Sequence, residues 1–521
     1  MTLPILFTLF TFVILSACSK QQEYLQPPKV DEFYTPPDDF RDYKVGDILK
    51  LRKTLAGLRS MYLSINIKNS WQLMVRSENT FGEASYMITT VMEPFNADPA
   101  KILSYQTFQD SADLDCSPSF SVQQGASRLD IGAQFDMTFI LMALQNGYYV
   151  VSPDYEGPQS AFLAGRQAGK AILDSIRAVL RSGKITGISQ DAEVAMWGYS
   201  GGAMATGFAA VLQPSYAPEI KERFIGVALG GFATNITEII HAIDGGFYAG
   251  LIPAALHGLA NEYTFLKPLM LEYVDPAQVE RMEKAADQCL INVWVRYVGS
   301  NIFSGKGAMF KNGAEFLKLP QVVDVLKDNS IIYLNASYVP QIPIFIYHSS
   351  FDPIVPIKDV YTVYDNWCEW GADSLEFSEG WLGNHITDIA LGAFAGWSWL
   401  EKRFEGVEPV VKGCHHHVMY SNIQYPGAIW KVLDYFKGYY NTLWYKPLGR
   451  GTKSTTTTNI TSIAVEYISE IKKSMIAYYK QRSQTRKGFN LGSYILFELM
   501  AIDSIGTSLS QKKLETLEDT L

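Results

Sequence analysis

A cluster of glycines around one serine constrains this chain more than any other feature. Residues 194–199 are mostly apolar and predict a strand, Gly198-Tyr199-Ser200-Gly201-Gly202 follows as a tight turn, and small residues then predict a helix. This strand–turn–helix pattern is typical of a nucleophile elbow, in which the serine sits in a strained turn. Side chains at positions 198 and 202 would collide with the neighbouring strand and helix. An ordinary strand-to-helix turn is the alternative, but the context favours Ser200 as a nucleophile.

Length, composition and net charge restrict the number of domains, the class of protein and the partners that this chain can have. The 521 residues suffice for one large α/β domain with insertions or for two or three smaller domains. Hydrophobic residues make up 47% and charged residues 19%, which is typical of a globular protein and not of a disordered one. The formal net charge of −9 argues against nucleic acid or an anionic membrane as a partner.

The chain opens with an apolar run at residues 5–16, followed by the small residue Ala17 and by Cys18. The run is too short to span a bilayer comfortably, and polar sequence follows it at once. We therefore predict a secretory signal peptide over residues 1–18 and a secreted, extracellular protein. Residues 15–18 also have the form of a bacterial lipoprotein box, which would leave a lipid on Cys18. No Lys or Arg precedes the apolar run, which disfavours that alternative.

Cysteine usage and glycosylation sequons agree with export. Beyond Cys18 the chain has four cysteines: Cys116, Cys289, Cys368 and Cys414. An even number in an exported chain predicts two disulfides, with three possible pairings, and no C-x-x-C spacing points to a metal site. Three Asn-X-Ser/Thr sequons are candidate glycosylation acceptors: Asn235, Asn335 and Asn459.

The chain on either side of the motif alternates between strand and helix patterns. Residues 19–46 hold two Pro-Pro pairs and predict an extended arm, and residues 58–110 predict antiparallel strands. A buried strand is expected at 148–153, a long helix from Pro158 to about residue 182, and a further strand at 224–229. Alternation of this kind predicts a parallel α/β sheet, whose first part we place at residues 47–234.

Residues 235–336 interrupt the alternation with a helical and unusually apolar region. A helical subdomain with its own core is the simplest interpretation. Because the region lies between strands expected to carry the site, we also predict that it acts as a lid. The sheet resumes over residues 337–450, and residues 451–521 form an extension of unknown role.

A serine hydroxyl needs a histidine base and an acid that holds this base. The chain has only seven histidines, so elimination is possible. His241 and His257 fall in the helical insertion, His348 lies within or at the end of a strand, and residues 415–417 are a His-His-His run that we expect to be a solvated loop. Adjacent residues cannot easily converge on one metal ion. His385 remains, on a loop after a strand, and is the predicted base.

Asp352 fits the acid position. α/β-hydrolases place nucleophile, acid and histidine in that order along the chain, each after a strand. Asp352 follows the strand at 342–348 and precedes His385. Asp359 and Asp365 are rivals, but both fall in the following helix and are expected to be surface charges.

An oxyanion formed during ester cleavage needs two preorganised N–H donors. The residue after the nucleophile, Gly201, supplies one. For the second we predict the backbone of Asp154, at the end of the 148–153 strand. A helix cap before Pro158 is the structural alternative and is compatible with that position.

Several blocks together resemble the secreted fungal lipases of the Candida antarctica lipase A type and the Candida secretory lipases. The blocks lie at residues 152–157, 161–165, 171–178, 198–203, 214–219, 352–356 and 385–387. The resemblance covers roughly residues 25–445 and follows the same order along the chain. It implies an α/β-hydrolase fold with a helical lid in the 235–336 region; the C-terminal extension has no clear counterpart.

The resemblance also implies roles for individual residues. It implies a catalytic triad of Ser200, Asp352 and His385, with oxyanion donors at Asp154 and Gly201. It implies disulfides Cys116–Cys289 and Cys368–Cys414. One departure is Tyr155, which stands where lipase A has a histidine and could alter the acyl entrance.

The predicted activity is that of a secreted serine lipase. It hydrolyses triacylglycerol esters at a lipid–water interface through an acyl-enzyme, as a monomer without a stable protein partner, a metal or another cofactor. One alternative is a soluble carboxylesterase or acyltransferase with the same triad. The other is a catalytically inactive lipid-binding surface protein, against which the intact Ser, Asp and His set argues.

Overall fold

The computed structural model describes residues 25–127, 132–407 and 412–451. The predicted signal peptide, the sequon at Asn459 and the predicted C-terminal extension from residue 452 lie outside these ranges.

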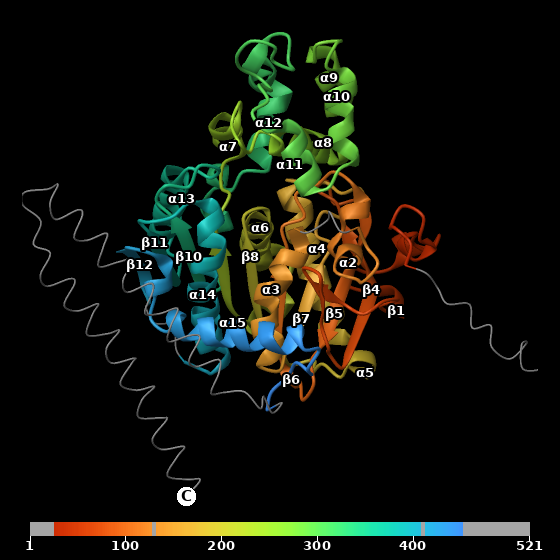
Figure 1. The fold of residues 1–521 in the computed structure, drawn as a ribbon, viewed down its shortest axis with the longest axis vertical. Coiled ribbons are helices and arrows are strands. Elements are labelled where there is room, and N and C mark those ends of the chain that lie inside the picture. The colour runs from red at the N-terminus through yellow and green to blue at the C-terminus, as the bar shows by residue number, and fades with distance from the viewer. Residues whose placement is uncertain (1–24, 128–131, 408–411, 452–521) are drawn as a thin grey trace, which may run out of the picture. The chain divides into compact units, whose positions relative to one another are not determined.

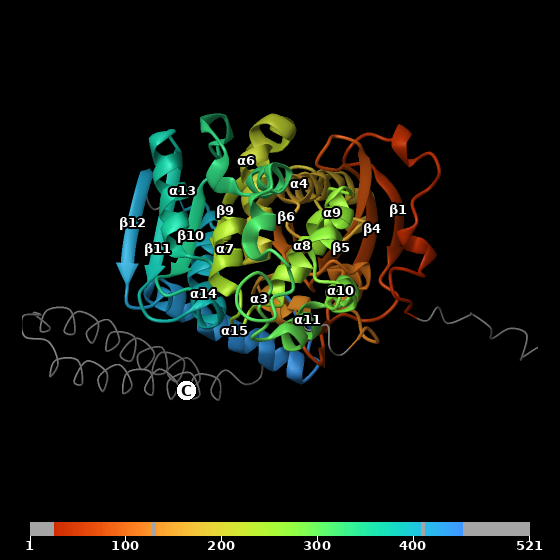
Figure 2. The ribbon, with the colours of Figure 1, turned by 90° about the horizontal axis from the view of Figure 1, so that it is seen from above.

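A ten-stranded sheet runs through the molecule in the order β1-β4-β5-β7-β6-β8-β9-β10-β11-β12 (Figures 1 and 2). Its strands are β1 (Ile48–Lys53), β4 (Asn69–Glu78), β5 (Ala84–Glu93), β6 (Asp98–Gln106), β7 (Tyr148–Pro153), β8 (Glu193–Tyr199), β9 (Phe224–Gly230), β10 (Ile344–Ser349), β11 (Ser374–Gly380) and β12 (Gly413–Met419). A separate two-stranded sheet joins β2 (Arg59–Ser60) and β3 (Leu63–Ser64).

The sheet is parallel from β7 to β12, as the alternation predicts. The antiparallel part expected within residues 58–110 holds for β4 and β5. It is wrong for β6, which inserts between β7 and β8 and is parallel to both. Residues 102–106 of β6 are buried in the middle of the sheet, a position that a local pattern of alternation does not encode.

Helices cover both faces of the sheet. The longer ones of the core are α3 (Gly132–Gln145), α4 (Gly165–Arg181), α6 (Gly201–Tyr216), α13 (Ile357–Glu369), α14 (His385–Phe404) and α15 (Ala428–Leu443), and the short ones are α2 (Pro118–Ser121) and α5 (Gly183–Thr186). Side chains of α4, α6 and α13 pack into one core cluster, and those of α3, α14 and α15 into another. Strand β8 alternates between them, with Met196 in the first cluster and Trp197 in the second.

The segment between β9 and β10 is helical, as predicted, and stands above the carboxyl ends of the strands (Figure 1). It contains α7 (Ile236–Ile243), α8 (Leu251–Glu262), α9 (Leu266–Tyr273), α10 (Val279–Glu283), α11 (Leu290–Tyr297) and α12 (Pro320–Asp328). Phe303, Phe310 and Phe316 pack against one another inside it. Within the described residues, no helix has the length and apolar character needed to cross a bilayer.

Two disulfides are formed, with the pairing that the family resemblance implies. Cys116, in the core before α2, is bonded to Cys289 of the helical insertion, just before α11. Cys368 near the end of α13 is bonded to Cys414 of β12.

Three local predictions are wrong, each for a physical reason. The helix expected from Pro158 begins only at Gly165, because Ser160 and Leu163 adopt left-handed φ angles of 50° and 68° that a helix cannot contain. His385 is not in a loop but is the first residue of α14, where Asn384 caps the helix. The histidine run at 415–417 is not a loop either, because it pairs with β11 as part of the edge strand β12.

Candidate active site

Ser200 occupies the sharp turn between β8 and α6. Its φ and ψ are 53° and −120°, a left-handed φ that a residue with a Cβ adopts only under strain. The turn is held on both sides, since the Ser200 N–H donates to the Gly230 carbonyl at 2.9 Å and the Ser200 carbonyl accepts from the Met204 N–H at 3.0 Å.

The glycines beside Ser200 allow two close backbone approaches. A Cβ at Gly198 would lie 2.3 Å from the Gly202 carbonyl oxygen, in the following helix. A Cβ at Gly202 would lie 2.0 Å from the carbonyl oxygen of Gln106, the last residue of β6. The structure therefore confirms the prediction that side chains at positions 198 and 202 would collide with the neighbouring helix and strand.

The structure brings Ser200, His385 and Asp352 into one hydrogen-bonded chain. His385 Nε2 lies 2.9 Å from Ser200 Oγ, and His385 Nδ1 lies 2.6 Å from Asp352 Oδ2. The other carboxylate oxygen of Asp352 accepts from the N–H groups of Ile354 and Val355, both at 2.8 Å. These contacts hold the acid, the imidazole and the hydroxyl in the order that general-base activation of a serine requires.

The surroundings favour a negative charge on Asp352. Burial alone would raise the pKa of Asp352, but the charge and hydrogen bond of His385 outweigh it and hold the pKa below its ordinary value of 3.8. His348 Nε2 lies 3.4 Å from Asp352 Oδ2, the oxygen that His385 contacts, and 3.1 Å from the Val355 carbonyl oxygen. Burial lowers the pKa of His348, so this second imidazole stays neutral.

The geometry contradicts the role predicted for Asp154. The Asp154 N–H donates to the Ile88 carbonyl at 2.8 Å, as a continuation of the pairing between β5 and β7. The Asp154 carboxyl is buried and accepts from the N–H and hydroxyl of Ser119. The Asp154 backbone is therefore committed to the sheet and does not serve as an oxyanion donor.

Asp110, which sequence reasoning missed, lies beside Gly201 instead. A Cβ at Gly201 would fall 2.1 Å from Asp110 Oδ1, an oxygen that is buried and has no hydrogen-bond partner among the described residues. Burial raises the pKa of Asp110 to about 7, partly offset by the charge of His385. The available signal was its place shortly after β6, but only the strand order shows that β6 is the immediate neighbour of β8.

Phe162 lies between Gly201 and helix α8 of the helical insertion. A Cβ at Gly201 would be 3.5 Å from the Phe162 ring, and a Cβ at Gly258 of α8 would be 2.5 Å from Phe162 Cβ. Asn261 of α8 also donates to backbone carbonyls in the segments that carry Asp110 and Phe162. Only 3% of the His385 side chain is exposed.

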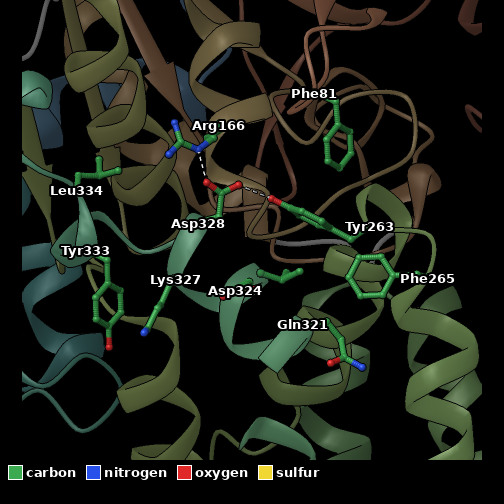
Figure 3. Close-up of a pocket in the computed structure, with 11 residues that line it drawn as sticks. Phe81, Arg166, Tyr263, Phe265, Gln321, Asp324, Lys327, Asp328, Tyr333 and Leu334 are labelled. Atoms are coloured by element: carbon green, nitrogen blue, oxygen red, sulfur yellow. Dashed lines mark hydrogen bonds and ion pairs between the residues drawn. The ribbon is translucent and has the colours of Figure 1, made fainter. Parts of the chain in front are cut away.

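A cleft of about 790 Å³ opens on another side of the insertion, and the triad residues do not line it (Figure 3). It is bounded by α12, by Phe81 and by aromatic side chains after α8. On its wall the carboxylate of Asp328 accepts from Arg166 Nε at 2.6 Å and from the Tyr263 hydroxyl at 2.8 Å. Because Arg166 belongs to α4, this ion pair ties the insertion to the core.

The remaining candidate residues differ in accessibility. Asn235 is buried as the N-cap of α7, accepting from the Glu238 N–H, so the folded chain cannot carry a glycan there. Asn335 is exposed. No group of three His, Cys, Asp or Glu side chains suited to hold a metal ion occurs in the described ranges.

Comparisons with known proteins show which proteins the chain is similar to. The chain matches the family described as "Secretory lipase" over residues 122–413. It is 50% identical to Lipase 1 of Candida albicans, over 82% of this chain and 92% of that protein, and 46% identical to Lipase 6 of the same organism, over 82% and 93%. The X-ray structure of Candida antarctica lipase A is similar with a TM-score of 0.70 and 29% identity, covering 82% of this chain and 100% of that chain.

Proposed function

This chain belongs to the secretory lipase family, and from that premise we propose that it hydrolyses triacylglycerol esters at a lipid–water interface through an acyl-enzyme. The observation that carries the proposal is the chain of hydrogen bonds from Asp352 through His385 to Ser200. The secretory family, the apolar N-terminal run and the two disulfides support an extracellular location. We propose a monomer without a required metal or organic cofactor.

Each member of the triad takes one step in this mechanism. Ser200 Oγ attacks the ester carbonyl carbon while His385 Nε2 takes the hydroxyl proton, and the Asp352 carboxylate stabilises the resulting imidazolium. The C–O bond to the glycerol oxygen then breaks, and His385 returns the proton to that leaving alcohol. A water molecule, activated by the same imidazole, attacks the acyl-enzyme and releases the fatty acid.

The oxyanion of each tetrahedral intermediate forms beside Gly201. The Gly201 N–H is the first amide of α6, so the positive end of a sixteen-residue helix supports it. We place Asp110 next to it as the second contributor, in place of Asp154. Asp110 Oδ1 is buried beside Gly201 without a hydrogen-bond partner among the described residues, so a protonated Asp110 carboxyl would donate a hydrogen bond to the oxyanion.

Apolar side chains around the triad support a lipid surface as the site of action. Phe351, which precedes Asp352, is 60% exposed, and Leu382 and Ile386, on either side of His385 in the sequence, are also exposed. Phe247 of the helical insertion is exposed as well and packs on Trp294. We propose that residues 235–336 are the lid over a core formed by residues 47–234 and 337–450, and that this rim contacts lipid.

A pair of assays tests the proposal. Purified secreted protein should hydrolyse emulsified triolein faster than a soluble butyrate ester, and Ser200→Ala should abolish both activities. Faster turnover of the soluble ester would favour the carboxylesterase alternative. Retention of most activity in Ser200→Ala, or no labelling of the native protein by a fluorophosphonate, would refute the serine mechanism.

A further inference from the structure

A buried carboxyl that the mechanism does not use lies one helical turn from His385. Asp388 is three residues further along α14, and 3% of it is exposed. Both carboxyl oxygens lie within hydrogen-bond distance of Asn422 Nδ2, at 2.9 and 3.0 Å. Asn422 is fully buried and comes from the short segment after β12, so two parts of the chain meet behind the catalytic histidine.

The surroundings of Asn422 fix the direction of its amide. Its Oδ1 accepts from the Ser378 hydroxyl at 2.7 Å, and its Nδ2 also donates to the His348 carbonyl at 3.3 Å. A Cβ at Gly380 would lie only 3.0 Å from Nδ2, so β11 also closes on the amide. The amide nitrogen therefore points at Asp388 and cannot rotate away without losing these contacts.

The carboxyl of Asp388 is in electrostatic contact with the triad. Burial raises the pKa of Asp388 to about 7, the Asn422 hydrogen bond lowers it, the charge of Asp352 raises it and the charge of His385 lowers it. The other titratable groups that face Asp388 are the phenols of Tyr199 on β8 and Tyr347 on β10. Besides Asp352 and Asp388, the groups in electrostatic contact with His385 are Asp110 and His348. Burial raises the pKa of both phenols well above 10, so they remain neutral.

Burying a carboxyl with a single hydrogen-bond donor costs free energy relative to burying an apolar residue of similar size. Apart from His385, the buried residues of α14 near Asp388, which are Ile389, Gly392 and Ala393, carry no polar side chain. The Tyr199 hydroxyl also donates to the His385 carbonyl at 2.7 Å, so the backbone of the first turn is fixed separately. The carboxyl of Asp388 is thus not needed to hold that backbone.

We propose that Asp388, oriented by Asn422, is a second acid behind the triad, whose negative charge stabilises the imidazolium form of His385 during acyl transfer. It is a positioning residue, since it touches neither substrate nor Ser200. The inference rests on the proposed serine mechanism. It adds to that mechanism a carboxylate whose charge appears as the pH rises through about 7.

The sign of the effect follows from this charge. When Asp388 is ionised, its negative charge favours the protonated imidazole of His385 over the neutral one. Replacing Asp388 with the isosteric amide removes the charge but keeps an oxygen that accepts from Asn422. The acid limb of kcat/KM, which reports the free enzyme, should then move to lower pH.

The test is a pH profile on p-nitrophenyl butyrate, a soluble ester that avoids interfacial effects. We expect Asp388→Asn to shift the acid limb down by about half a pH unit or more, and to lower kcat at pH 8 about three- to tenfold. Asn422→Ala leaves the carboxyl without its donor and therefore neutral to higher pH. It should shift the limb in the same direction and serves as the deciding variant if Asp388→Asn does not fold.

Glu376→Gln is the matched control. Glu376 is also a buried carboxyl, on the neighbouring strand β11, and accepts from Trp399 Nε1 at 3.1 Å, away from the triad. Its substitution should leave the acid limb in place. If the two test variants fold and lower the melting temperature but keep the native pH profile, Asp388 is only structural and the proposal is overturned. Failure of the serine mechanism itself would show separately, as residual activity in Ser200→Ala.

Discussion

A methyl group added at Gly202 should move the Ser200 hydroxyl out of hydrogen-bond distance of His385 Nε2. In Gly202→Ala the new Cβ would lie 2.0 Å from the Gln106 carbonyl oxygen, and Cβ contacts below 3.0 Å are essentially not found. The atom it meets is backbone in the middle of the sheet, so no side chain can rotate to relieve the clash. The start of α6 and the end of β6 must therefore separate by about 1 Å.

That displacement acts directly on the reacting atoms. Ser200 lies two residues before Gly202, and its hydroxyl is 2.9 Å from His385 Nε2. A shift of about 1 Å in a reacting group typically costs about a hundredfold in rate, and overpacking a core costs about 1–3 kcal/mol of stability. We expect kcat on a soluble ester to fall about a hundredfold or more, with a lower melting temperature.

Stopped assays with p-nitrophenyl butyrate, together with a thermal melt, measure both effects. Gly57→Ala is the control, because its new Cβ would meet only the side chain of Gln124, at 3.2 Å. It should retain native kcat and nearly native stability. Native kcat in a folded Gly202→Ala protein would show that the contact between Gly202 and Gln106 does not set the position of Ser200.

Three further outcomes are expected. Phe351→Ser removes an exposed ring from the rim and should weaken triolein hydrolysis about tenfold or more without changing the turnover of a soluble ester. The control Ile185→Ser, at an exposed position on α5, should change neither activity. Equal loss of activity on both substrates in Phe351→Ser would contradict a lipid contact. Burial raises the pKa of Asp154 to about 7, above its ordinary value of 3.8. The stabilisation that Asp154 contributes is therefore complete below about pH 4 and is lost as the pH rises to about 7. Over that pH range the melting temperature of Asp154→Asn should fall less steeply than that of the native protein. Cys116→Ser opens a disulfide between residues 173 positions apart and should lower the free energy of unfolding by about 2–5 kcal/mol, measured by urea titration; an unchanged midpoint would show that this bond does not stabilise the fold.

The sequence allowed the nucleophile to be predicted because its requirements are local. The turn at Ser200 needs glycines within two residues, and the flanking strand and helix are visible as patterns. His385 and Asp352 followed from the small number of histidines and from chain order, and the structure places both within hydrogen-bond distance of their partners. Their exact secondary structure was less accessible, since the Asn384 cap moves the start of α14 to His385 itself.

Residues whose neighbours depend on strand order could not be found in this way. Asp154 and Asp110 both follow a strand, and only the insertion of β6 between β7 and β8 places Asp110 beside Gly201. The same holds for Asp388 and Asn422, which are 34 residues apart and meet only because β12 pairs with β11. Local patterns report which residues form a strand but not which strand lies next to it.

The Cys116–Cys289 bond determines how the helical insertion can move. The insertion is joined to the core by the chain at both of its ends, and this covalent link adds a third fixed point just before α11. Three attachment points restrict a rigid-body movement of the insertion more than two would. If residues 235–336 act as the proposed lid, uncovering Ser200 requires bending within the insertion. Reduction of the Cys116–Cys289 bond would leave only the two chain connections and so permit a hinge motion.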